Sequence, residues 1–312
     1  MSGTRVGTRE LPRAAPTTTR AQRLRPRRNP WRRPVFLEGF TWLYVLWSLA
    51  PIAIAVLFSF NNGKSQSVWQ GFSMRWYTTD PLNSVLHDPT LHAAVAQTIR
   101  LAVLTTVIAI PLGVAFAIGI DRWRGRPAKV ANFVMVFSFV IPELIFAVAL
   151  FFVFNTLFVT VHLGTTAEVL GLVTWNVSWP AIIVRARLVT IGRQYEEAAA
   201  DLGASRLQAV RRVLLPMLMP AIFASGVLVF SGVIDDFVLV DLLSSTAPTQ
   251  PMSVIIYSNT HGGNSGPALN ALATLMLLVS FVAAGTGFLA YRWMTRGERN
   301  SQDEALSTFA GV

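Results

Sequence analysis

The sequence predicts an all-α membrane protein with six transmembrane helices, on the strength of its composition and of the spacing of its apolar stretches. The chain of 312 residues is 53% hydrophobic and only 13% charged, with a mean hydropathy of +0.49, a balance unlike that of a soluble domain. Its apolar residues gather into stretches that reach the roughly 20 residues needed to cross a bilayer. Polar or arginine-rich segments separate these stretches, so we expect a chain that crosses the membrane repeatedly.

Residues 1–34 form a basic segment that precedes the first apolar stretch. It holds ten of the 24 arginines and five prolines with almost no apolar periodicity, which predicts a disordered cytoplasmic tail. Such a tail fixes topology and contacts anionic membrane lipid more often than it binds nucleic acid, so nucleic acid is not an expected partner. It is also too long and too rich in proline for the charged region of a cleaved signal peptide.

The six predicted spans lie at residues 36–60, 93–120, 130–161, 167–189, 217–243 and 268–294. Together they define a six-span domain over residues 35–295, followed by a cytoplasmic C-terminal tail at 296–312. Four spans contain a proline that we expect to kink its helix where neighbouring groups satisfy the freed carbonyl, namely Pro111, Pro142, Pro180 and Pro220. The polar segments at 61–92 and 244–267 are expected to be external loops.

The basic residues set the orientation of the spans. Of the 26 lysines and arginines, 23 fall in the N-terminal tail, after the second span, around residues 185–212 or at the C-terminal end. Lys64 and Arg75 fall in a segment assigned to the outside, and Arg100 lies within a span. The positive-inside rule then places both termini in the cytoplasm. A count of five or seven spans would put the basic tail or the segment near residue 197 outside.

A polar segment at about residues 192–216 separates the fourth and fifth spans. Two blocks within it read Glu197-Ala198-Ala199-Ala200-Asp201-Leu202-Gly203 and Val213-Leu214-Leu215-Pro216. They favour two short helices joined by a turn at Gly203, the second ending before Pro216. Taken alone, ordinary helix ends with a glycine stop would explain the first block equally well. The spacing of both blocks resembles the EAA loop of membrane subunits of binding-protein-dependent ABC importers, with Val213 in place of the usual isoleucine.

This resemblance implies a permease subunit, not an enzyme, with a cytoplasmic coupling helix between the fourth and fifth spans. It assigns contact with an ATPase to Glu197, Ala198, Ala199, Asp201, Gly203, Leu215 and Pro216. The implied partners are a homologous permease subunit, two ATPase subunits and an extracytoplasmic solute-binding protein, at the plasma (inner) membrane of a prokaryote. The sequence has no glycine-rich phosphate loop ending in Gly-Lys-Ser/Thr, so ATP and Mg are expected on the ATPase and no cofactor on this chain. With no cysteine and four scattered histidines, no metal site is expected.

Four acidic residues fall inside or near the outer ends of apolar spans, namely Glu143, Asp235, Asp236 and Asp241. A charge in such a position is costly and needs a reason. Hydrogen bonding between helices, or pairing with Arg100, is one explanation. The other is a cation path, in which carboxylates around a water-filled cavity hold a small polycation by charge-assisted hydrogen bonds. We assign the path to Asp235 and Asp236, with Glu143 as a third member.

Aromatic residues near these acids, Phe237, Trp175 and Trp179, could add cation–π contacts, although packing explains them as well.

Segments 234–238, 251–258 and 267–274 look like the second permease subunit of spermidine/putrescine importers, and 141–144 is similar to a Ser-Pro-Asp stretch there, with glutamate replacing aspartate. The resemblance covers about residues 93–295 and implies ATP-driven translocation of a small cationic solute, a polyamine. An importer for another small solute shares the same plan and stays open. An ion-coupled secondary transporter would predict an inverted repeat, which we do not find, and a membrane scaffold would leave the intramembrane acids without a purpose.

Overall fold

The computed structural model describes residues 35–65, 67–81, 83–122, 125–262 and 266–310, so the predicted tail at 1–34 lies outside the described residues. The chain divides into two units, Met1–Ala50 and Pro51–Val312. The described part of the first unit is the beginning of α1 (Val35–Ser59). Apart from one isolated bridge between Asn61 and Phe72, the described residues form helices, turns and loops, which confirms the all-α prediction.

The second unit carries the remaining elements. They are η1 (Arg75–Thr79), α2 (Pro89–Arg122), α3 (Arg126–Phe137), α4 (Glu143–Thr156), α5 (Thr165–Asn176), α6 (Ser178–Ile191), α7 (Gln194–Asp201), α8 (Arg206–Ala209), η2 (Val210–Leu214), α9 (Leu215–Asp235), α10 (Val238–Leu243), η3 (Ala247–Thr249), α11 (Met252–His261) and α12 (Pro267–Ala310). Five described helical stretches are long and apolar enough to cross a membrane, namely Phe36–Ser59, Pro89–Arg122, Thr165–Ile191, Arg206–Asp235 and Pro267–Arg292. They correspond to five of the six predicted spans.

The third predicted span, 130–161, is not one helix. Helix α3 ends at Phe137 and α4 begins at Glu143, and between them Pro142 has extended backbone angles (φ −60°, ψ 132°). Proline has no N–H to continue a helix and disfavours helical angles in the residue before it, so Pro142 breaks the helix that we expected it only to kink. The apolar helix that follows has 14 residues, fewer than the roughly 20 of a full span.

Three further boundaries differ from the sequence prediction. The fifth span, expected to run to residue 243, leaves the helix at Asp236, which has extended backbone, and resumes as α10. The external segment 244–267, expected to be a loop, contains α11. The last helix continues past the expected end at residue 294 to Ala310.

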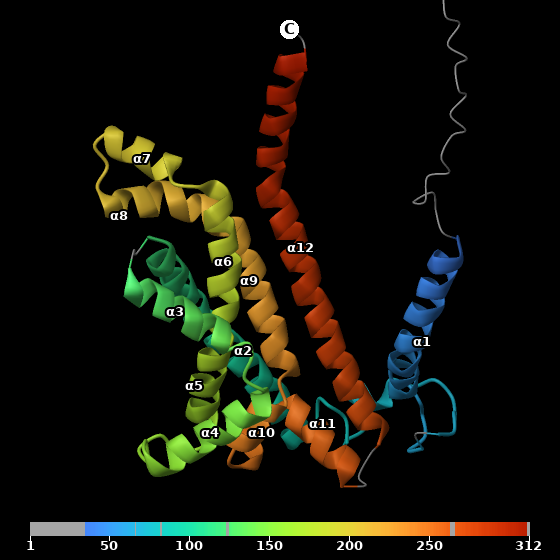
Figure 1. The fold of residues 1–312 in the computed structure, drawn as a ribbon. Coiled ribbons are helices and arrows are strands. Elements are labelled where there is room, and N and C mark those ends of the chain that lie inside the picture. The colour runs from blue at the N-terminus through green and yellow to red at the C-terminus, as the bar shows by residue number, and fades with distance from the viewer. Residues whose placement is uncertain (1–34, 66, 82, 123–124, 263–265, 311–312) are drawn as a thin grey trace, which may run out of the picture. The chain divides into compact units, whose positions relative to one another are not determined.

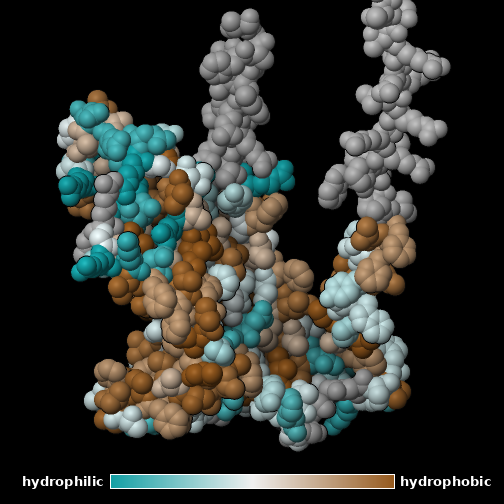
Figure 2. All heavy atoms as spheres, in the orientation of Figure 1, coloured by the Kyte–Doolittle hydropathy of each residue, from teal (hydrophilic) through white to brown (hydrophobic). Residues whose placement is uncertain are grey.

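Within the second unit, α2 packs against α6 and α9. Its contact with α6 depends on Gly113, because a Cβ atom there would lie 2.4 Å from Pro180 Cγ and 2.8 Å from the carbonyl oxygen of Val177. Figure 1 shows α7 and α8 at one end of α6 and α9, α5 at the other end of α6, and α10 and α11 near the other end of α9. In Figure 2 hydrophilic residues gather over α7 and α8, and hydrophobic residues cover the helices next to them. This unit therefore has a polar end at α7 and α8 and an apolar surface over the helices beside them.

Candidate functional site

A cavity of about 350 Å³ lies beside the break between α9 and α10. Its charged lining consists of Glu143, Asp235 and Asp236, and Trp175, Trp179 and Phe237 line it as well. The structure therefore brings together all three acids that the sequence assigned to the substrate path. The helix break at Pro142 places Glu143 in the first turn of α4, and the break after Asp235 places the two aspartates opposite it.

The three carboxyl groups differ in their surroundings. Asp236 is half-buried, its Oδ1 atom accepts a hydrogen bond from the backbone N–H of Leu239 at 3.2 Å, and its carboxyl group lies close to that of Glu143. A cation in the cavity would compensate the charge of these two neighbouring carboxyl groups. Asp235 is exposed and faces the same cavity.

The aromatic residues of the lining are held by other rings. Trp175 packs against Phe146 with ring centroids 5.2 Å apart, and the rings of Phe237 and Tyr257 lie 4.2 Å apart. Packing therefore fixes their positions, while both Trp175 and Phe237 still face the cavity. These rings sit where they could meet an ammonium group near the carboxylates.

The alternative that Arg100 neutralises the intramembrane acids is not what the structure shows. Arg100 is exposed on α2, and the ion pairs among the described residues do not include it. Asp241 is exposed on α10 and is not part of the cavity lining.

The segment predicted to be a helix–turn–helix has that form. Helix α7 carries Glu197, Ala198, Ala199 and Asp201, and Gly203 follows it with φ +85°, in the left-handed region that favours glycine. The backbone N–H of Gly203 donates to the Ala200 oxygen at 2.9 Å, and that of Ala204 to the Ala199 oxygen at 2.9 Å, which closes the helix end. Ser205 and Gln208 then form a capping box that starts α8.

The second helix of this segment does not end before Pro216, contrary to expectation. Residues Val210–Leu214 form a π-helical turn in which the N–H of Leu215 bonds to the carbonyl of Val210. This wider turn makes room for the proline ring, so Leu215 and Pro216 begin α9 and the chain stays helical from Arg206 to Asp235. Coupling roles for these two residues stay predictions.

Sequence reasoning missed two features of this molecule. Leu202 and Leu207, at the tip of the helix–turn–helix, are 90% and 76% exposed. Glu168 on α5 is completely buried, and its Oε2 atom accepts a hydrogen bond of 2.7 Å from Nε2 of Gln97 on α2. Polar residues within the apolar spans, Gln97 and Glu168 among them, signal that each side chain needs a partner, but the sequence does not show which partner each one has.

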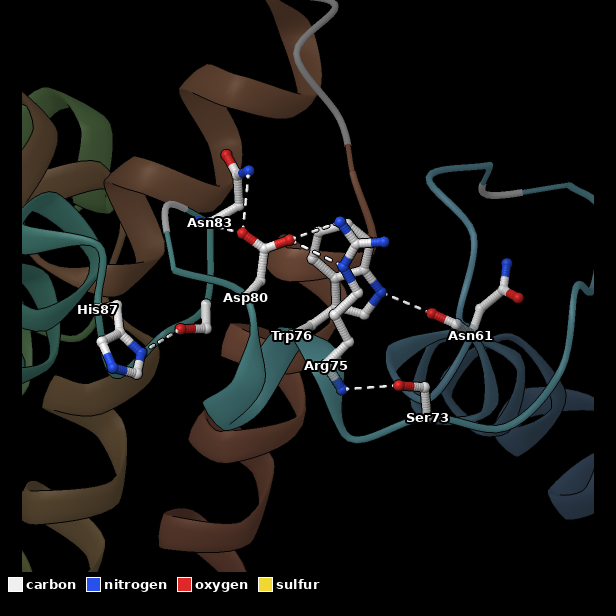
Figure 3. A network of polar contacts seen from close by, with 8 residues as sticks. Asn61, Ser73, Arg75, Trp76, Asp80, Asn83 and His87 are labelled. Atoms are coloured by element: carbon white, nitrogen blue, oxygen red, sulfur yellow. Dashed lines mark hydrogen bonds and ion pairs between the residues drawn. The ribbon is translucent and has the colours of Figure 1, made fainter.

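The polar segment between α1 and α2 is folded back on itself by side-chain contacts, which Figure 3 shows. Arg75 Nε donates to Asp80 Oδ2 at 2.8 Å, and Asp80 also accepts from the N–H of Asn83 at 2.9 Å. The indole N–H of Trp76 donates to the carbonyl of Asn61 at 2.6 Å. This segment was expected to be an external loop, and it has a defined conformation built on the buried Trp76 and Asp80.

Apolar helices long enough to cross a membrane, a solute-sized acidic cavity beside broken helices and a polar helix–turn–helix define a membrane subunit of a transport system. The chain belongs to the family described as binding-protein-dependent transport system inner membrane component, whose model matches residues 109–298.

Two bacterial relatives extend this assignment. The chain is 34% identical to the putrescine transport system permease protein PotI of Escherichia coli K12 over 87% of its own length and 93% of the relative. It is 29% identical to the spermidine/putrescine transport system permease protein PotC of the same organism, over 83% of this chain and 92% of the relative. The chain is therefore a permease subunit of a binding-protein-dependent ABC importer, homologous to these two proteins.

Solved structures agree in fold. A bacterial ABC transporter involved in the import of the acidic polysaccharide alginate matches with a TM-score of 0.68 at 17% identity, covering 84% of this chain and 96% of the other. The MetNI methionine ABC transporter matches with a TM-score of 0.55 at 20% identity, covering 66% of this chain and 94% of the other.

Proposed function

We propose that this permease carries a polyamine, of the putrescine and spermidine class, through the cavity lined by Glu143, Asp235 and Asp236. The observation that carries the proposal is the convergence of these three carboxyl groups on one cavity of about 350 Å³. Ammonium groups would bind there by charge-assisted hydrogen bonds, and the neighbouring rings would add cation–π attraction. The same lining disfavours an acidic solute because like charges would meet.

The proposed topology has six passages, with α3 and α4 together forming the third. The distribution of basic residues supports cytoplasmic termini and a cytoplasmic position for α7 and α8. In this arrangement a homologous permease completes the path, a solute-binding protein delivers the polyamine to segments 65–92 and 244–267, and two ATPase subunits bind ATP and Mg. This chain itself needs no cofactor.

The helix–turn–helix is the proposed contact with an ATPase subunit. Leu202 and Leu207 stand out from its tip, where large apolar side chains are costly unless a partner covers them. Glu197 and Asp201 on α7 would frame this apolar contact with polar ones, and Gly203 permits the turn that presents it. ATP-driven closure of the two ATPase subunits would then move the attached helices.

The test is uptake of labelled putrescine and spermidine by cells that lack the gene and carry either the wild type or a variant. Asp235→Asn/Asp236→Asn and Glu143→Gln remove charge from the cavity and should each lower uptake by at least about tenfold, the effect of losing a charge-assisted contact to a desolvated ammonium. Asp241→Asn is the matched control, because it removes an acid outside the lining and should leave uptake unchanged.

Membrane levels of all variants must be equal for the comparison to count. Wild-type complementation that restores uptake of neither polyamine would refute the substrate assignment while leaving the importer class intact. Full uptake by the Asp235→Asn/Asp236→Asn variant would show that the solute does not depend on this cavity.

A further inference from the structure

Four charged side chains connect the end of α2 with the beginning of α7. Arg122 Nη2 lies 2.7 Å from Glu196 Oε2, and Arg122 also contacts Asp121. Arg193 Nη2 donates to the backbone oxygen of Asp121 at 2.6 Å and lies 4.0 Å from its carboxylate. The four residues thus form a continuous network between two elements that are distant in the sequence.

The network is partly sheltered from water. The side chains of Arg122, Asp121 and Glu196 are 21%, 18% and 17% exposed. Isolated ion pairs on a surface contribute little, whereas a partly buried network of several charges resists separation because each charge left behind would lose its partner. We call this set, Asp121, Arg122, Arg193 and Glu196, the latch.

Besides the latch, helix α7 contacts η2 and α8, and its own residues stay accessible. None of its eight residues is buried, and it is joined to α6 through Gly192, whose φ of +74° marks a sharp turn. Loss of the latch would therefore remove the charged link between α7 and the end of α2 near this turn.

Helix α2 in turn holds two elements that shape the acidic cavity. Gln97 donates to Glu168 of α5 at 2.7 Å, and α5 carries Trp175. Thr98 Oγ1 accepts the backbone N–H of Met252 of α11 at 2.8 Å. Tyr257 of α11 packs on Phe237, which lines the cavity. A displacement of α2 would therefore reach the cavity wall through both contacts.

We propose that the latch makes α2 move together with α7, so that Arg122 and Glu196 are positioning residues that convert movement of the coupling segment into a change at the acidic cavity. This inference rests on the proposed docking of α7 and α8 to an ATPase. It assigns a mechanical role to charges that neither touch the solute nor belong to the exposed tip.

This chain has no cysteine of its own, so spin labels can be attached at two introduced cysteines before the permease is assembled with its partner subunits. Labels at Gly119→Cys, on an exposed part of α2, and Ala200→Cys, on the last turn of α7, report the distance between the two elements in the purified full importer. With the wild-type latch, a single narrow distance distribution should persist with and without ATP. Glu196→Gln should broaden it, Glu196→Asp should broaden it less, and the surface control Gln194→Ala should leave it narrow.

The same variants are then reconstituted with labelled putrescine as solute. Glu196→Gln should retain the ATPase subunits and their ATP hydrolysis while solute transported per ATP falls about fivefold, the equilibrium shift expected from losing a partly buried ion pair. Equal distance distributions in wild type and Glu196→Gln, or an undiminished transport ratio, would overturn the latch. If the proposed docking to an ATPase is wrong, the wild-type permease will retain no ATPase subunit. In that case, the distance between the two labels in the permease alone still shows whether the latch holds α7.

Discussion

The packing of α2 against α6 at Gly113 yields a quantitative prediction. A methyl group at Gly113 would lie 2.4 Å from Pro180 Cγ and 2.8 Å from the Val177 carbonyl oxygen, whereas ordinary contacts begin near 3.4 Å. Neither a proline ring nor a backbone oxygen can rotate away, so Gly113→Ala must move the two helices apart by about 1 Å. Overpacking of this kind costs about 1–3 kcal/mol.

The control for this substitution is Gly119→Ala on the same helix, where an added Cβ meets nothing within 4 Å. Both substitutions gain helix propensity, up to about 1 kcal/mol, so their difference isolates the clash. Thermal unfolding of the detergent-purified permease should show a midpoint for Gly113→Ala several degrees below that of Gly119→Ala. A midpoint for Gly113→Ala at or above that of the control would refute the packing argument.

Three other substitutions test separate parts of the structure. Gly232 lines the acidic cavity and has open space at its Cβ position. Gly232→Leu should therefore obstruct the cavity and lower putrescine uptake, while Gly119→Leu should not. Equal uptake by these two variants would contradict the cavity assignment. Gly203→Ala forces a side chain into left-handed backbone at a cost of about 1–2 kcal/mol and should weaken co-purification of the ATPase, and unchanged retention would argue against the turn's role. Glu168→Leu removes one of the two acceptors of Gln97 Nε2, which also donates to Thr165 Oγ1 at 2.9 Å, and should lower the unfolding midpoint by an amount equivalent to about 1–3 kcal/mol, whereas Gln97→Leu/Glu168→Leu should recover much of it; a double variant as unstable as the single one would count against the buried hydrogen bond.

The sequence was sufficient to predict elements whose cause is local. Hydropathy over about 20 residues locates the five long apolar helices, and the glycine in the Glu197–Gly203 block locates the turn. The effect of a proline depends on its neighbours instead. Pro180 and Pro220 lie inside the continuous helices α6 and α9, whereas the helix is interrupted before Pro142. Just before this interruption, the hydroxyl groups of Ser138 and Ser178 share a hydrogen bond of 2.7 Å.

The candidate site was predictable only in part, because it too depends on contacts between distant segments. Asp235 and Asp236 are adjacent in the sequence, so their shared location follows at once, but the approach of Glu143 depends on two helix breaks that hydropathy does not reveal. Glu168 and Gln97 are 71 residues apart, and nothing in either apolar stretch indicates that their side chains meet. In both cases, contacts between segments that are far apart in the sequence decide which side chains meet.

The break in α9 explains why the acidic cavity and α11 occur together. A chain that leaves the helix within an apolar span exposes backbone groups that lipid cannot satisfy, so such a break persists only where other protein groups or a water-filled cavity supply partners. Here Ser253 of α11 donates to the carbonyl of Asp236 at 2.7 Å, and the Asp236 side chain accepts the N–H of Leu239. The aspartate that faces the cavity is thus also the residue that α11 holds in place. Displacement of α11 would therefore move the backbone of Asp236 and, through it, the carboxyl group that faces the cavity.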